Sequence, residues 1–166
     1  RSVGQLPLFY NHLNTGRPDP DSHSFNRYSS NYLDMSNEPL YPFGYGLSYT
    51  NFSYGNLQLS SDVLSRNGEL TVSVTVTNDG DFDGYEIVQM YLHDIYAEIS
   101  RPVKELKGFE RIFLKKGESR EVKFVITEDD LRFYNSGLQY VYEPGEFDVM
   151  VGANSRDVQT ERFRAD

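Results

Sequence analysis

The sequence contains no cysteine among its 166 residues. Disulfide bonds and thiolate metal sites are therefore excluded, which leaves the redox compartment open. No apolar run approaches the length of a transmembrane helix, and no secretory signal peptide is visible. Because the first residue is Arg1 rather than Met, we expect the true start of the protein to lie elsewhere or to have been removed.

Basic residues are scarce relative to acidic ones, at 16 Lys and Arg against 25 Asp and Glu, which gives a net charge of −9. This balance argues against nucleic acid, since phosphate binding needs clustered Lys and Arg, and against an anionic membrane surface. It does not exclude a neutral polysaccharide. The 38% hydrophobic and 14% aromatic content indicates a folded, β-rich protein rather than a disordered one.

Rings and prolines are concentrated in residues 1–54, which hold eleven of the 24 Phe and Tyr residues and five of the seven prolines. Strand periodicity is nearly absent there. Since so long an irregular stretch is unusual inside a compact domain, we interpret it as an arm that lies on a neighbouring surface. Residues 3–10 predict one short edge strand, because Pro7 forbids a central one.

From residue 55 onward the pattern becomes that of β-strands. Apolar and polar side chains alternate over 70–77, 88–93, 121–126 and 147–152, and more weakly over 57–59, 103–114, 140–142 and 158–163. Turn residues stand between these segments, and Thr127 begins a capped helical turn. Residues 55–166 therefore predict an all-β, antiparallel β-sandwich. The alternation places His93 on a polar, solvated face with Gln89 and Tyr91.

The run from Tyr41 to Thr50 packs four rings, a proline and two glycines into ten residues. It is too rich in glycine for a helix interior and has the wrong period for a half-buried strand. Two roles are open for its rings, a sugar-stacking platform or the core of a contact between domains. We favour interdomain packing, because exposed apolar patches of this size are rare. The rings are Tyr41, Phe43, Tyr45 and Tyr49.

Several motifs along the chain carry a family resemblance. They are Val3–Pro7, Tyr10–Pro18, Tyr41–Thr50, Val88–Asp94, Ser100–Glu110 and Glu143–Phe147. Together they resemble the C-terminal part of family 3 glycoside hydrolases of the periplasmic β-glucosidase type. The resemblance implies that residues 1–54 are the end of an α/β sandwich domain with an aromatic linker arm. It implies a fibronectin type III-like, immunoglobulin-like β-sandwich over residues 55–166.

The resemblance also implies a parent enzyme that removes β-linked glucosyl units with retention of configuration. That reaction needs a carboxylate nucleophile and a carboxyl general acid/base. Nothing here matches the nucleophile's motif, so we assign no catalytic residue and no cofactor, and we expect the isolated chain to be inactive. The implied partners are the N-terminal catalytic domains of the same polypeptide and, through them, a β-linked oligosaccharide. The implied location is the bacterial periplasm or outside the cell, and homodimer formation by the parent is left open.

Three functions compete at this point. The first is a non-catalytic C-terminal module that stabilises the catalytic core and assists oligosaccharide binding. The alternative is an independent carbohydrate-binding or adhesion β-sandwich, and the third is a small enzyme complete in itself. The arm favours the first, because a free-standing module has no use for a long aromatic strap. The third has no activated nucleophile or convergent acid–base set.

Three residues are candidates for sugar contact. Asn14 and Arg17 lie where the chain leaves the implied α/β domain, and their side chains suit sugar hydroxyls, although a simple turn around Gly16 is the favoured interpretation. Arg101 supplies a fork of donors for hydroxyls or carboxylates. For Arg101 we favour pairing with an acid of the catalytic core over a sugar contact.

The turn after residue 78 raises a calcium hypothesis. Asp79, Asp81, Asp83 and Gly84 fit the first six positions of an EF-hand loop, but Met90 stands where the twelfth position requires Glu. A polar hairpin turn explains the same residues. We therefore predict no metal site, while calcium binding by the three aspartates is left open.

Overall fold

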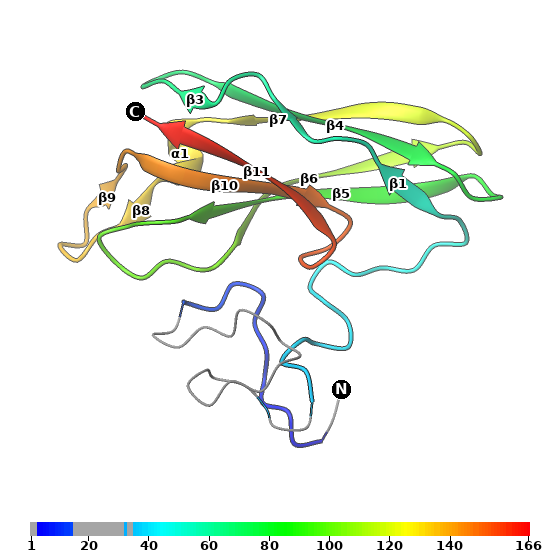
Figure 1. Ribbon diagram of the computed structural model, residues 1–166, viewed down its shortest axis with the longest axis horizontal. Coiled ribbons are helices and arrows are strands. Elements are labelled where there is room, and N and C mark those ends of the chain that lie inside the picture. Colours follow the sequence, from blue (N-terminus) through cyan, green and yellow to red (C-terminus); the bar gives the residue numbers. More distant parts are fainter. Residues whose placement is uncertain (1–2, 15–31, 33–34) are drawn as a thin grey trace.

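The computed structural model describes residues 3–14, 32 and 35–166, and their regular structure is almost entirely β (Figure 1). The elements are β1 (Phe52–Tyr54), β2 (Gln58–Leu59), β3 (Val63–Leu64), β4 (Leu70–Asn78), β5 (Gly84–Asp94), β6 (Glu105–Leu114), β7 (Ser119–Ile126), α1 (Glu128–Leu131), β8 (Phe133–Tyr134), β9 (Tyr140–Val141), β10 (Gly145–Gly152) and β11 (Val158–Ala165). Each strongly alternating segment of the sequence lies within a strand. The described residues contain no candidate for a membrane-spanning helix.

The strands form two packed sheets and one small hairpin. In the first sheet β4 pairs with β7 along one edge, while β1 and β2 share the other edge. The second sheet has the order β3-β11-β10-β5-β6, and all of its pairs are antiparallel except β3 with β11. Strands β8 and β9 form the hairpin. The predicted all-β sandwich is confirmed.

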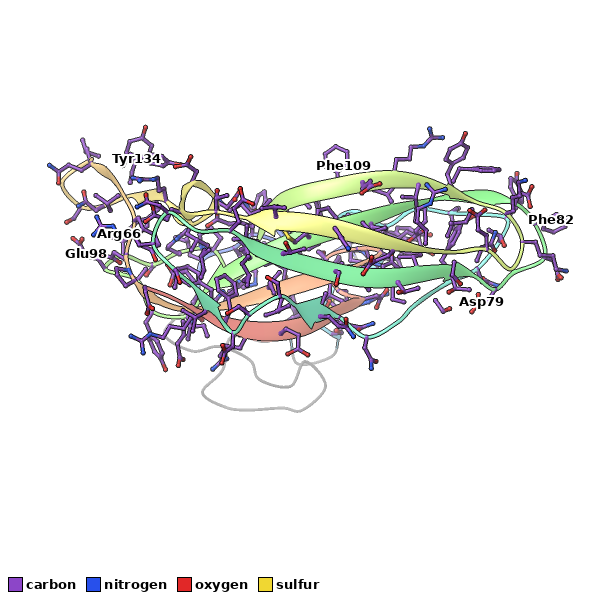
Figure 2. All side chains as sticks on the ribbon, turned by 90° about the horizontal axis from the view of Figure 1, so that it is seen from above. Arg66, Asp79, Phe82, Glu98, Phe109 and Tyr134 are labelled. Carbon is purple, nitrogen blue, oxygen red and sulfur yellow. The ribbon has the colours of Figure 1, made fainter. Side chains whose placement is uncertain are left out.

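The core lies between the two sheets and follows from the alternation. The inward residues of β4, from Leu70 to Val76, are at most 2% exposed, and they face Val88 and Met90 of β5 across the core. Burying each such side chain stabilises the fold by about 1.5–3 kcal/mol. Figure 2 shows the polar side chains on the outer faces, with Asp79 and Phe82 at one end of the sandwich and Arg66 and Tyr134 at the other.

The helical turn α1 begins as the sequence predicts. The backbone N–H and the hydroxyl of Thr127 both donate to the Asp130 carboxylate, at 2.9 and 3.0 Å. These bonds satisfy a backbone donor that the short helix leaves unpaired. Leu131 ends the helix and is only 2% exposed, so it anchors the turn to the core.

Two expectations for local structure are wrong. Residues 3–10 form turns and irregular backbone rather than an edge strand, and the nearest ladder contact is a single bridge between Leu13 and Pro102. A strand needs a neighbouring strand, and the described chain supplies none there. The Gln89 side of β5 is not a solvated polar face either. Gln89 and Tyr91 are 3% and 0% exposed, because the arm covers them.

Candidate functional site: the arm and its junction with the sandwich

The described parts of the arm, residues 3–14 and 35–50, lie beside the outer face of the five-stranded sheet (Figure 1). Three rings from separate segments meet at the junction. Tyr10 stacks on Phe43 with centroids 4.0 Å apart, and it meets Tyr91 of β5 edge to face at 5.8 Å. Burial, followed by the nearby Tyr10 hydroxyl, raises the pKa of Tyr91, so its phenol stays neutral and donates a hydrogen bond.

Gln89 is the polar centre of this junction. Its Nε2 donates to the carbonyl of Gly44 at 3.1 Å and to that of Ala153 at 2.7 Å, and its Oε1 accepts from the Tyr91 hydroxyl. Gly44 has a φ of +78°, and a Cβ on it would overlap the Gln89 side chain. Glycine is therefore required both for the backbone conformation and for the close approach.

Backbone hydrogen bonds tie both halves of the arm to the sandwich. Ser155 N–H donates to the carbonyl of Phe43, and Val103 N–H donates to that of His12, each at 2.9 Å. Lys104 Nζ donates to the Ser155 carbonyl at 2.7 Å. Burial lowers the pKa of Lys104, while the charge of Glu38 acts in the opposite direction. The arm is thus fixed to its own sandwich along one side.

The other side of the arm is left open. The four rings singled out in the sequence are exposed by 65% (Tyr41), 46% (Phe43), 42% (Tyr45) and 96% (Tyr49). Leu6 and Leu47, at 72% and 91%, extend this apolar surface, which we call the arm face. Tyr41 and Tyr45 contact each other with centroids 5.2 Å apart. Phe43 differs from the other rings in that it stacks on Tyr10, which is itself bound to the sandwich.

The end of the arm is anchored by a buried asparagine. Asn78 is fully buried and accepts a hydrogen bond from the Thr50 hydroxyl at 2.6 Å. Its amide donates to the carbonyls of Phe82 and Leu114 at 2.8 and 3.0 Å. The strand pairing starts at Phe52, so the chain passes directly from this anchor into the first sheet.

The three candidate sugar-contact residues have different positions. Asn14 is exposed beside the Leu13–Pro102 bridge, and Arg17 lies outside the described residues. The side chain of Arg101 is 7% exposed and donates to Asp94 at 3.0 Å and Glu105 at 2.8 Å. It also donates to the Leu131 carbonyl and lies over the Phe133 ring. A contact with sugar or with another domain would have to replace one of these partners, and both roles stay predictions.

The pKa values of the two carboxyl groups in the Arg101 network are shifted in opposite directions. Burial raises the pKa of Asp94 despite the neighbouring Arg101 charge. Burial acts the same way on Glu105, but its bond to Lys107 and the charges of Lys107 and Arg101 outweigh it, so the pKa of Glu105 is lowered. The network joins the ends of β5 and β6 to the segment after α1, which indicates a structural role in this part of the chain.

The aspartates of the calcium hypothesis do not converge on one point. Lys116 contacts two of them, through its Nζ to Asp81 at 2.7 Å and through its backbone N–H to Asp83 at 2.9 Å. Among the described residues, no group of three or more His, Asp or Glu side chains is placed to hold a metal ion. The hairpin interpretation accounts for these contacts.

Comparison with known proteins first defines the class of the sandwich. Residues 86–155 match the model of the fibronectin type III-like domain. This segment begins in β5 and ends after β10, and it therefore includes three of the five strands in the second sheet.

The whole chain then matches β-glucosidases. It is 51% identical over 164 residues to a periplasmic β-glucosidase of Salmonella typhimurium, covering 98% of this chain and 21% of that protein. A β-glucosidase from Listeria innocua, solved with isofagomine, superposes with a TM-score of 0.90 at 46% identity, covering 98% of this chain and 22% of that one. A putative β-xylosidase of Formosa agariphila is 42% identical over 99% of this chain and 20% of its own length.

The chain thus contains a fibronectin type III-like domain and resembles a C-terminal fragment of a family 3 β-glucosidase. It spans about a fifth of the length of the relatives it matches. The motifs quoted from the sequence were sufficient to find this family. They did not reveal the junction of Tyr10 with Gln89 and Tyr91; Tyr10 lies in the irregular arm, and the signal of the other two was only strand alternation.

Proposed function

We propose that this chain is the non-catalytic C-terminal module of a retaining β-glucosidase, and that its arm face docks on the catalytic domains of the same polypeptide. The observation that carries the proposal is the exposure of Tyr41, Tyr45 and Tyr49 on an arm whose opposite side is hydrogen-bonded to its own sandwich. Large apolar surfaces of this kind mark interaction sites. The relatives are about five times longer than this chain, so a partner surface within one polypeptide is available to it.

The proposal gives the junction a mechanical role. The arm is held to the sheet by Gln89 and by the stack of Tyr10 on Phe43, and its free side would contact the catalytic core. The sandwich would then stabilise that core by fixing the arm in one conformation, which lowers the entropic cost of docking. Residues 1–54 would belong to the core and its linker, and residues 55–166 would form the module.

Finer parts of the function follow from the same proposal. Asn14, which is exposed, and Arg17 would approach the oligosaccharide where the arm meets the catalytic core. The parent would act in the bacterial periplasm or outside the cell, as the name of the Salmonella relative says of that protein. Homodimer formation by the parent stays a prediction, which sedimentation of the longer polypeptide would test.

The first test is activity on an aryl β-glucoside. We expect turnover by the longer polypeptide and none above buffer by the 166-residue chain, because this chain is assigned no nucleophile. The second test replaces Tyr49 with Ala in the longer polypeptide, with Tyr134→Ala as the matched control, since Tyr134 is also exposed but lies at an end of the sandwich (Figure 2). Tyr49→Ala should lower the melting temperature and Tyr134→Ala should not. Turnover by the isolated chain, or equal melting temperatures of the two variants, would contradict the proposal.

A further inference from the structure

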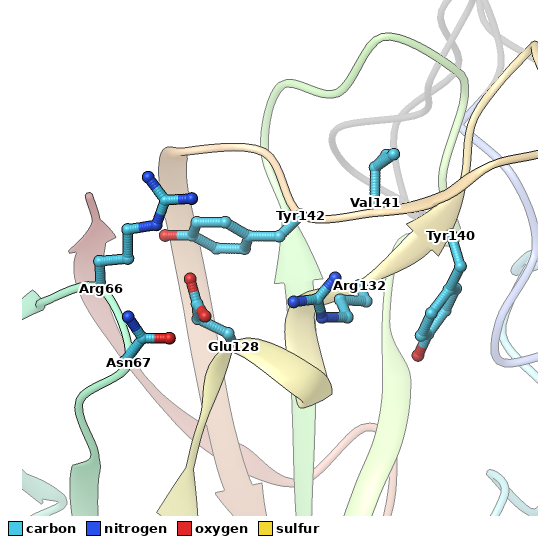
Figure 3. A pocket seen from close by; sticks show the side chains of 7 residues that line it. All are labelled: Arg66, Asn67, Glu128, Arg132, Tyr140, Val141 and Tyr142. Carbon is cyan, nitrogen blue, oxygen red and sulfur yellow. The ribbon is translucent and has the colours of Figure 1, made fainter.

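A polar groove of about 510 Å³ lies at the end of the sandwich that carries α1. Its lining comes from the turn between β3 and β4, from α1 and from the segment around β9 (Figure 3). The side chains used below are Arg66, Asn67, Glu128, Arg132, Tyr140 and Tyr142. The volume is within the range of about 300–1,000 Å³ that small-molecule sites occupy.

Three polar side chains, two from the turn between β3 and β4 and one from α1, gather at the hydroxyl end of one ring. Figure 3 shows Arg66, Asn67 and Glu128 around the Tyr142 hydroxyl, which donates to the backbone carbonyl of Asp166 at 2.8 Å. That bond holds the ring in place, and the ring also packs against the core. The turn that carries Arg66 and Asn67 is closed by a hydrogen bond from Gly68 N–H to the Ser65 carbonyl at 2.8 Å. The groove is therefore formed before any ligand arrives.

The groove retains unused hydrogen-bonding capacity. Within the described part of the chain, neither the Arg66 guanidinium nor the Glu128 carboxylate has a hydrogen-bond or ion-pair partner. Arg66 offers donors only and Glu128 offers acceptors only. A ligand that bonds to both must carry groups that donate and accept, and hydroxyls do so.

The charges around the groove favour an uncharged ligand. Arg132 is paired with Asp129 through its Nε at 3.0 Å, which leaves Arg66 and Glu128 as the two free charges. These are of opposite sign and cancel. An anionic ligand would gain from Arg66 but would be repelled by Glu128 and Asp129.

Aromatic surface continues beyond the groove. Tyr140 is 52% exposed and contacts Tyr134, which is 63% exposed, with centroids 5.0 Å apart. Flat rings beside polar groups suit a ligand that has both C–H faces and hydroxyls. The order along the sandwich end is thus a polar groove followed by a tyrosine pair.

We propose that this groove binds a glucosyl unit of a neutral β-linked oligosaccharide, with Arg66, Asn67 and Glu128 contacting its hydroxyls and Tyr142 its C–H face. The next unit lies on the Tyr134–Tyr140 pair. The choice of sugar rests on the proposed function, whereas the site itself rests on the groove.

The test is an NMR titration of the 166-residue chain with cellotetraose. We expect saturable shifts of the amides of Arg66, Asn67, Glu128 and Tyr142. Arg66→Ala and Glu128→Ala should each weaken binding about tenfold. The matched control is Arg120→Ala, which removes an exposed arginine from β7 and should leave binding unchanged. Tyr142→Phe keeps the ring and should retain most of the affinity, which separates ring contact from folding defects.

Two outcomes would overturn the inference. One is the absence of saturable shifts in the groove up to about 10 mM sugar, because a preformed site should bind more tightly than that. The other is binding of glucuronate or sulfate with the same affinity as cellotetraose, which would make the groove an anion site. Neither outcome affects the docking of the arm, because that is measured on Tyr49 in the longer polypeptide.

Discussion

Replacing Gln89 with Ala should release the arm from the sandwich without unfolding it. The variant removes the hydrogen bond from Gln89 Nε2 to the Gly44 carbonyl, and it also removes the bond to Ala153 and the acceptor of the Tyr91 hydroxyl. The bond to Gly44 joins β5 to the arm. The other two bonds lie within the sandwich, so their loss lowers the stability of the sandwich without acting on the arm.

The size of the effect follows from the loss at Gly44. A hydrogen bond lost from a partly buried carbonyl costs about 1–2 kcal/mol. Each 1.4 kcal/mol is a factor of ten in an equilibrium constant. We therefore expect the opened state of the arm to be populated about 5- to 30-fold more in the variant.

Hydrogen exchange at two backbone amides measures this opening. Ser155 N–H is bonded to Phe43 and Val103 N–H to His12, so both become exchangeable when the arm leaves. Both rates should rise together. Gln159→Ala is the matched control, because Gln159 on β11 also makes three hydrogen bonds through its side-chain amide, to backbone groups of Tyr54, Gly55 and Leu57. Unchanged rates in Gln89→Ala, or an equal rise in the control, would refute the reasoning.

Three further predictions use single substitutions. Gly44→Ala should raise the hydrogen-exchange rates of the same two amides at least as much as Gln89→Ala does, because it adds strain at positive φ. Gly46→Ala should leave these rates unchanged, because no atom lies within 4 Å of its added Cβ. Arg101→Ala should lower the free energy of unfolding in urea by about 3 kcal/mol by leaving a buried carboxylate unpaired, against less than about 0.5 kcal/mol for the exposed Arg164→Ala. Burial raises the pKa of Glu86 above its ordinary 4.5, so the wild type should lose stability relative to Glu86→Gln as the pH rises from below 4.5 to neutral; a constant difference would contradict this.

The sandwich was predictable because its strands have one buried face. In β4 every second residue from Leu70 to Val76 is apolar and buried, so the period of two is visible in the sequence itself. The turn at Thr127 was equally local, since its acidic residues follow the cap directly. Such features depend on neighbours in sequence, and no knowledge of the tertiary structure is needed to find them.

The junction was not predictable because its partners are distant in sequence. Gln89 and Tyr91 alternate with apolar residues as solvent-facing residues do, and only the arm, about 45 residues earlier at Gly44, makes that face a buried one. For Arg101 the sequence predicted a partner in the catalytic core or a sugar, and it did not reveal the partners within this chain. Its partner Asp94 lies at the end of the preceding strand, and its Leu131 contact is 30 residues away.

The most direct test of the account is hydroxyl-radical footprinting of the arm face. In the 166-residue chain Tyr49 is 96% exposed and should be labelled readily, as should Tyr134 at 63%. In the longer polypeptide, we predict that labelling of Tyr49 and Tyr41 falls several-fold while Tyr134 is labelled as before. Equal labelling of Tyr49 in the two proteins would show that the rings do not dock, and it would contradict the account.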